Sequence, residues 1–192
     1  MHPKLAHYIS NLGNPLLTIP VFSVIALFQT EDPKTALFVS LLIVAGVVVP
    51  ILIKSYRGVQ KGTYTNYDIS NKAQRQSWYL FPTLLLAAVT LILFLTDQSQ
   101  ALRMGVAGAL ALFIAAQLVN LYIKTSLHVG FNTYLAFLIF PFNWAVGVGT
   151  LVFSFFLGWS RIVLKRHTLA EVVSGALLGL VVGGLMLWAR GF

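Results

Sequence analysis

The chain has no cysteine and very few charges. Without cysteine among its 192 residues, disulfides and thiolate chemistry are excluded. Only 9% of the residues are charged and 58% are hydrophobic, whereas roughly 25% are charged in an ordinary soluble domain. This composition excludes a soluble globular protein, a disordered chain and a nucleic-acid-binding domain. It favours one integral membrane domain that covers residues 1–192.

Acidic residues are especially scarce. The whole chain holds five of them: Glu31, Asp32, Asp68, Asp97 and Glu171. No two of them lie at metal-ligand spacing on the membrane face that carries most of the lysines and arginines, whereas magnesium-dependent chemistry on diphosphates uses carboxylate ligands. A zinc site built on cysteines or on a His-x-x-Glu-His pattern is also absent. The sequence therefore argues against a magnesium-dependent prenyltransferase or a CDP-alcohol transferase, and we expect no metal and no other cofactor.

Long apolar runs are abundant instead. The runs near 14–30, 36–54, 78–96, 101–123 and 168–190 approach the roughly 20 residues that a helix needs to cross a bilayer. Residues 129–158 form a longer run that contains Pro141, which disfavours helix at the residue before it. We therefore divide this part of the chain into two short helices, 127–141 and 143–158. The prediction is an all-α polytopic membrane bundle with about six to seven transmembrane helices.

Basic residues are distributed unevenly over such a bundle. Seven spans place the segments 1–13, 54–77, 124–128 and 159–167 at one end, which we call the basic end. These segments hold ten of the 13 lysines and arginines, and the opposite end holds only Lys34, Arg103 and Arg190. Because lysine and arginine favour the cytoplasmic side, we expect the basic end to face the cytoplasm, in a prokaryotic inner membrane.

Two histidines, His128 and His167, lie at the mouths of predicted spans at the basic end. Ionisable groups near the membrane are costly and often mark functional sites. His167 and Glu171 are four residues apart, so a helix places them on one face. A carboxylate that accepts the imidazole Nδ1–H leaves Nε2 free to attack. Arg161 suits phosphate oxygens, and the helix that begins near Ser126 favours an anion at its N-terminus.

These segments resemble two motifs of the type 2 phosphatidic acid phosphatase family, a membrane branch of the acid phosphatase/vanadium-haloperoxidase-like fold. The family's third motif, S-R-x5-H-x3-D, is similar to Ser160-Arg161-x5-His167-x3-Glu171. Its second motif, P-S-G-H, is similar to Thr125-Ser126-Leu127-His128. The 31 residues between the two motifs match the family's two intervening helices. The resemblance covers residues 120–192 well, with the motifs in 120–175, and the earlier half loosely.

The family's first motif, K-x6-R-P, is altered in this chain. The nearest segment is Asp68-x6-Arg75-Gln76, which keeps the arginine but lacks the lysine and the proline. A substitute cation could come from Lys72, Lys124 or Lys61. We interpret Asp68 as the cap of a short helix rather than as a contact to phosphate.

The resemblance implies a role for each matched residue. His167 would attack phosphorus and become a phosphohistidine, Glu171 would orient it, and His128 would protonate the leaving oxygen and then activate water. The phosphate-binding residues would be Arg161, Ser126, Arg75, Lys72 and Lys124.

The implied function is a metal-independent phosphatase that acts on a lipid phosphate in the membrane, with no nucleic-acid partner. Phosphatidic acid, phosphatidylglycerophosphate and a polyprenyl phosphate or diphosphate remain alternative substrates. A lipid phosphotransferase would use the same phosphohistidine with an alcohol as acceptor. The altered first motif motivates a third alternative, a non-catalytic relative that binds or transports lipid phosphates. The oligomeric state stays open.

Overall fold

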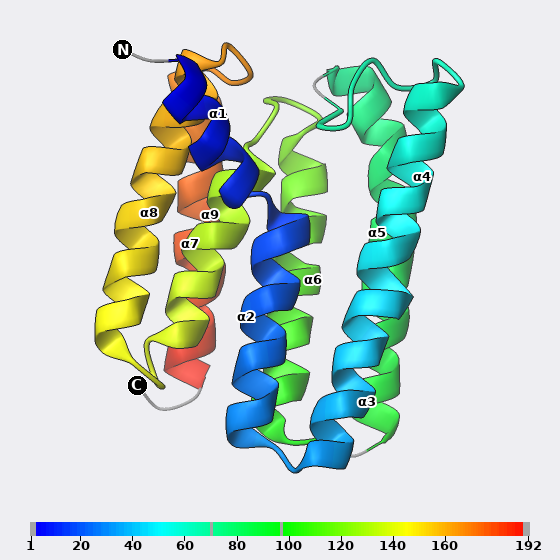
Figure 1. Ribbon diagram of the computed structural model, residues 1–192, viewed down its shortest axis with the longest axis vertical. Coiled ribbons are helices and arrows are strands. Elements are labelled where there is room, and N and C mark those ends of the chain that lie inside the picture. Colours follow the sequence, from blue (N-terminus) through cyan, green and yellow to red (C-terminus); the bar gives the residue numbers. More distant parts are fainter. Residues whose placement is uncertain (1–2, 70, 97, 190–192) are drawn as a thin grey trace.

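The computed structural model describes residues 3–69, 71–96 and 98–189, and in these ranges the chain is all-α, as the sequence predicts. The helices run side by side along one long axis (Figure 1). A π-helical stretch, η1 (Val44–Val48), joins α3 to α4 without a break. The helices are α1 (Pro3–Leu12), α2 (Pro15–Thr30), α3 (Pro33–Ile43), α4 (Val49–Gln60), α5 (Lys72–Leu95), α6 (Gln100–Val119), α7 (Leu127–Ile139), α8 (Trp144–Val163) and α9 (Leu169–Ala189).

Membrane-spanning helices dominate the described ranges. Five are long and apolar enough to cross a bilayer: α3 with η1 and α4, then α5, α6, α8 and α9. A sixth span results if α1 and α2, which meet at 46°, act as one. The chain is thus an integral membrane protein with five to six candidate spans. The seventh span is not supported, because the 13 residues of α7 measure roughly 20 Å at 1.5 Å per residue, short of the hydrocarbon core.

The predicted break in the long apolar run after residue 127 is confirmed. Helix α7 ends at Ile139, and α8 begins at Trp144 after a turn that contains Pro141. The side chain of Asn143 caps α8 by accepting a hydrogen bond from Val146 N at 3.1 Å. Helix α8 then continues to Val163, so the second piece is longer than predicted and long enough to span.

Helix α7 forms the buried centre of the C-terminal half. Every residue from Leu127 to Ala136 is buried, between α8 on one side and α9 on the other. Glycines on α9 allow the close approach: a Cβ at Gly175 would lie 2.4 Å from Ser126 O, and one at Gly179 would lie 2.4 Å from Gly130 O. Because its neighbours cover it, a helix too short to span can lie at membrane depth.

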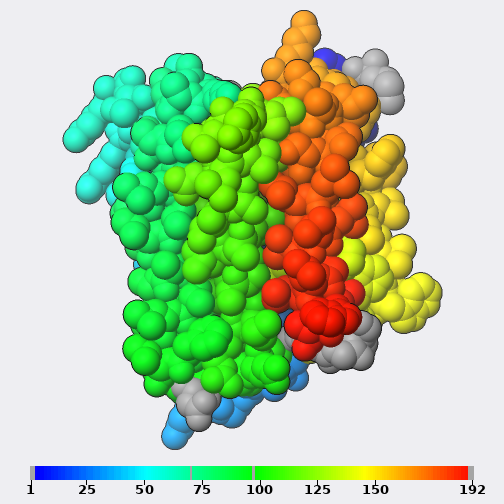
Figure 2. All heavy atoms as spheres, turned by 180° about the vertical axis from the view of Figure 1, so that it is seen from behind, coloured from blue at the N-terminus to red at the C-terminus, as the bar shows by residue number. Residues whose placement is uncertain are grey.

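The outer face of the bundle is apolar, as a lipid environment requires. Figure 2 shows the face built by α5, α6 and α9. Large hydrophobic side chains on these helices are exposed, among them Leu84, Leu91, Leu118, Leu177 and Val181. Facing hydrocarbon, these side chains need no further protein cover.

The four basic segments meet at one end of the molecule, as predicted. Helix α1 and the loops that follow α4, α6 and α8 lie together at the top of Figure 1. The turns after α2, α5 and α7 lie at the opposite end. Arg190, which the sequence assigns to that opposite end, lies outside the described residues, and so does Asp97.

Candidate active site

The sharp turn between α8 and α9 is the foundation of the candidate site. Lys165 adopts a left-handed conformation with φ 54°. Lys165 N then donates to Ile162 O at 2.9 Å and Arg166 N donates to Arg161 O at 3.0 Å, the pattern that ends a helix in a Schellman motif. His167 N also donates to Arg161 O, at 3.3 Å. The turn therefore returns His167 to the last turn of α8, where Arg161 lies.

His167 and Glu171 form the predicted pair. Nδ1 of His167 lies 2.8 Å from Oε2 of Glu171. The same carboxylate oxygen accepts a hydrogen bond from Thr168 N at 3.2 Å, which fixes it at the start of α9. With the proton on Nδ1, the imidazole keeps its Nε2 lone pair free. His167 is only 6% exposed, so the ring is held in one place.

The surroundings of His167 favour its neutral form. Burial and the nearby cations Arg75, Arg161 and Lys124 hold the pKa of His167 well below its usual range. A neutral imidazole is the form that can act as a nucleophile.

Lys124 lies directly beside the histidine–carboxylate pair. Its ammonium is 3.6 Å from Oε2 of Glu171 and donates to Arg166 O at 2.7 Å. Burial lowers the pKa of Lys124, and the Glu171 carboxylate only partly opposes this shift. The structure thus brings one of the three candidate substitute lysines, Lys124, to the site.

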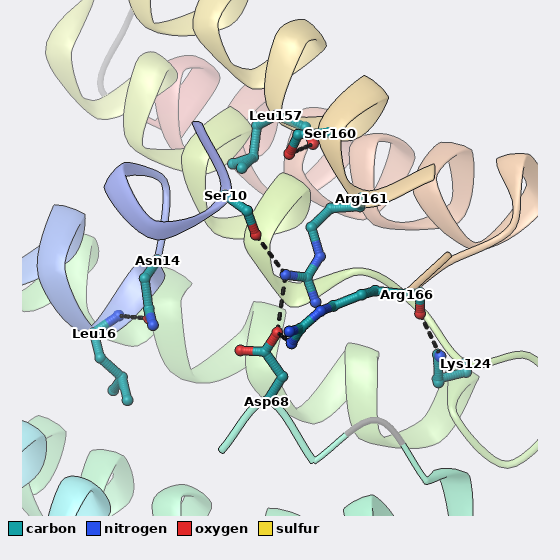
Figure 3. Close-up of polar contacts among 9 residues, drawn as sticks. All are labelled: Ser10, Asn14, Leu16, Asp68, Lys124, Leu157, Ser160, Arg161 and Arg166. Carbon is teal, nitrogen blue, oxygen red and sulfur yellow. Dashed lines mark hydrogen bonds and ion pairs between the residues drawn. The ribbon is translucent and has the colours of Figure 1, made fainter. Parts of the chain in front are cut away.

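Arg161 is the most buried cation of the site, and its partner is Asp68. Only 1% of Arg161 is exposed. Its Nη1 donates to Oδ2 of Asp68 at 3.0 Å and to Oγ of Ser10 at 2.7 Å. Arg166 pairs with the same carboxylate oxygen. Figure 3 shows the Asp68 carboxylate facing both arginines, while Ser10 reaches Arg161 from α1.

The interpretation of Asp68 as a helix cap is wrong. Asn71 caps α5, because its side-chain oxygen accepts hydrogen bonds from Ala73 N at 3.0 Å and Gln74 N at 3.2 Å. The loop after α4 folds over the basic end and carries Asp68 to the arginines. Burial works to raise the pKa of Asp68, but the charges of Arg161, His128 and Arg166 outweigh it and hold the pKa below its usual value.

Arg75 and Lys72 both contact the loop that leads into α7, at different depths. Arg75 is buried, and its Nη1 donates to Thr125 O at 2.7 Å. Lys72 lies at the exposed edge, where its ammonium donates to Leu121 O and Tyr122 O, both at 3.0 Å. The structure therefore places Arg75 at the site but directs Lys72 to carbonyls of the loop that follows α6.

Ser126 and His128 begin α7 at the same place. Both are buried, and Asn132 holds this turn by donating to His128 O at 2.7 Å. Oγ of Ser126 and Nε of Arg161 are buried without a hydrogen-bond partner among the residues that the structure describes. Buried donors without partners are costly. An anion that accepts hydrogen bonds from them would remove this cost.

Taken together, the site joins a neutral histidine, oriented by a carboxylate, to several cations and a second histidine. Its members come from α5, the loop before α7, α7 itself, α8 and α9. Sequence reasoning missed Ser10 and Arg166 and misassigned Asp68. Arg166 precedes His167 directly, which is a usable signal, but no local pattern marks Ser10. Within the described ranges, no three His, Cys, Asp or Glu side chains are grouped as metal ligands.

Comparison of the chain with protein-family models, curated proteins and solved structures finds no match.

Proposed function

We propose that the chain is a metal-independent lipid phosphate phosphatase, related to the type 2 phosphatidic acid phosphatases, that works through a phosphohistidine. One observation carries the proposal: the buried His167 imidazole lies 2.8 Å from Glu171, among Arg161, Arg75 and Lys124. This combination supplies a neutral nucleophile beside cations that can bind a phosphoryl group.

The proposed reaction has two steps. In the first, Nε2 of His167 forms a bond to phosphorus while the bond to the lipid oxygen breaks, and His128 gives that oxygen its proton. In the second, His128 takes a proton from water, the water oxygen bonds to phosphorus, and the bond to His167 breaks. A phosphomonoester yields inorganic phosphate and a lipid alcohol, and a lipid diphosphate yields inorganic phosphate and a lipid monophosphate.

The surrounding cations carry most of the catalytic effect in this proposal. Phosphoryl transfer depends mainly on positioning and on stabilising the charge of the equatorial oxygens. Arg161, Arg75 and Lys124 would supply that positive charge, and the unpaired Oγ of Ser126 would donate a hydrogen bond. Lys124 would thereby replace the lysine that the altered first motif lacks.

The excess of lysine and arginine at the basic end supports an orientation for the proposed enzyme. Because the cytoplasmic side of a membrane protein is richer in these residues, the site would open to the cytoplasm in a prokaryotic inner membrane. Its substrate would be a lipid phosphate in the facing leaflet.

The deciding experiment measures phosphate release by the detergent-purified protein in the presence of EDTA. The lipid panel is phosphatidic acid, phosphatidylglycerophosphate and a polyprenyl diphosphate. We expect release by the wild type, and a loss of at least about a thousandfold in His167→Ala, because the nucleophile is removed. His7→Ala is the matched control, since His7 is exposed on α1, and it should keep full activity.

Other outcomes would contradict the proposal. Release that survives His167→Ala would rule out the phosphohistidine, and release abolished by EDTA would rule out a metal-independent reaction. Transfer to an added lipid alcohol in place of release to water would identify a phosphotransferase. Binding of lipid phosphates without any turnover would identify the non-catalytic relative.

A further inference from the structure

A long cavity leads from the candidate site into the membrane-embedded part of the bundle. It has a volume of about 450 Å³ and lies between α2, α4, α5, α6 and α7. Its walls are mainly apolar, with side chains such as Ile19, Phe22, Val89, Phe113 and Leu138. This volume falls within the roughly 300–1,000 Å³ of ordinary ligand sites.

The two ends of the cavity differ in chemistry. Asp68, Arg75 and His128 line one end, whereas Glu31 and Ser99 line the other. Helix α2 runs along the cavity between these ends, and its 16 residues rise roughly 24 Å at 1.5 Å per residue. That length is most of the roughly 30 Å hydrocarbon core. An apolar cavity with this reach, with basic side chains at only one of its ends, suits an extended hydrocarbon chain that carries an anionic head.

Asp68 lies where the cavity meets the arginines. It lines the charged end of the cavity, and its carboxylate also binds Arg161 and Arg166 (Figure 3). Guanidinium groups bind carboxylate and phosphate oxygens through the same donors. The unpaired Nε of Arg161 shows that one donor of this buried group remains unused. A phosphoryl group, with more oxygens than a carboxylate, could use it.

We propose that the hydrocarbon chain of the lipid phosphate lies in this cavity, with its phosphoryl group taking the place of the Asp68 carboxylate on Arg161 and Arg166. This inference rests on the proposed function and defines its substrates as phosphates with one long chain directed into the bundle. Asp68 is then a positioning residue. It keeps the arginines paired in the empty site and competes with phosphates that lack a chain to hold them there.

The chain-binding part is tested by binding rather than turnover. The probes are hexadecyl phosphonate, which is not hydrolysed, and inorganic phosphate, each titrated into the protein in nanodiscs. Gly105 lines the cavity, and a Cβ there meets nothing within 4 Å, so Gly105→Leu adds a bulky side chain at the cavity wall without a backbone clash. We expect this variant to bind hexadecyl phosphonate at least about tenfold more weakly and inorganic phosphate unchanged.

Gly149→Leu is the matched control for the chain-binding test. A Cβ at Gly149 on α8 also meets nothing within 4 Å, but Gly149 is not part of the cavity wall. This variant should bind both probes as the wild type does. Equal binding of hexadecyl phosphonate by Gly105→Leu and Gly149→Leu would overturn the assignment of the cavity.

The Asp68 part is tested with Asp68→Asn, which keeps the shape of the side chain and removes its charge. We expect inorganic phosphate to bind at least about tenfold more tightly to this variant than to the wild type. Asp32→Asn is the control at the opposite end, where asparagine serves equally well as the helix cap. An unchanged phosphate affinity in Asp68→Asn would overturn the idea that the carboxylate stands in the phosphoryl position.

Two further measurements keep the tests decisive. If Asp68→Asn is unstable because Arg161 loses its partner, inorganic phosphate should restore its thermal stability, and no rescue would count against the proposal. Asp68→Glu keeps the charge and should not gain phosphate affinity. If the binding results hold while every lipid phosphate stays intact, the proposed hydrolysis fails and the binding site stands.

Discussion

Two titratable side chains at the basic end are each held in one charge state, one neutral and the other ionised. His167 is kept neutral by burial and by the cations around it, and Asp68 is kept ionised by Arg161, His128 and Arg166 despite its burial. Each state suits a role in the proposals, the first as a nucleophile and the second as the anion that occupies the arginines before substrate binds. At this scale, function depends on a few contacts between residues far apart in sequence.

The lowered pKa of His167 predicts how stability depends on pH. The unfolded chain takes up a proton on this histidine near pH 6.5, while the folded protein does not. The contribution of His167 to the free energy of unfolding is therefore fully present above about pH 6.5. Below that pH, the folded protein loses up to about 1.4 kcal/mol of stability for each pH unit, because the unfolded chain binds a proton that the folded protein does not. We expect the melting temperature in detergent to fall more steeply from pH 7 to pH 5 in the wild type than in His167→Asn. Parallel curves would show that His167 is not held neutral.

Among the helices, the contact between α7 and α9 decides whether the site assembles. Helix α7 carries His128, and Glu171 lies in the first turn of α9. The Ser126 N–H donates to Glu171 O at 3.0 Å, which ties the start of α7 to the start of α9. Small residues on α9 allow the backbones to approach this closely, in the manner of small-residue helix packing in membranes. Gly175 and Gly179 are two of these small residues, and a Cβ at either would lie 2.4 Å from a backbone oxygen of the facing segment.

A leucine scan along α9 tests this contact. In Gly179→Leu, the new Cβ would lie 2.4 Å from Gly130 O and 2.8 Å from the Cβ of Thr133, and the backbone oxygen cannot move aside cheaply. We expect a loss of about 1–3 kcal/mol of stability together with loss of lipid phosphate hydrolysis. Gly184→Leu, where a Cβ meets nothing within 4 Å, should change stability by less than about 0.5 kcal/mol. Equal melting temperatures for the two variants in detergent would contradict the prediction.

The molecule as a whole is a bundle with one strongly basic end and an apolar outer face. The polar groups of the site lie at the basic end, while the cavity extends from them through most of the bundle. A lipid phosphate shares this polarity, with an anionic head at the membrane surface and an apolar chain in its interior. The orientation of the bundle therefore decides which leaflet supplies the proposed substrate.

Cysteine labelling can determine this orientation, because the chain contains no native thiol. Thr63 and Thr96 are both exposed, in the loop after α4 and at the end of α5 respectively, which are opposite ends of the bundle. In intact cells, a membrane-impermeant maleimide should label Thr96→Cys and spare Thr63→Cys. Lysis should make both accessible. The reverse pattern in intact cells would place the site on the outer side.

The sequence by itself determined the features that depend on local spacing. Apolar runs of span length predicted the all-α bundle and the positions of its long helices, although α7 proved too short to count as a span. Pro141 predicted the break before α8. The four-residue spacing of His167 and Glu171 predicted their contact, because the helix repeat itself brings such residues together.

Only the tertiary structure decided the contacts between distant segments. Asp68 reaches Arg161 across 93 positions and Ser10 reaches it across 151, while Lys72 turns to the carbonyls of a loop 49 positions away. The cavity likewise exists only because several helices pack around it without filling it. Spacing along one helix carries no information about how loops fold over the end of a bundle, since burial and charge pairing across the whole molecule select those contacts.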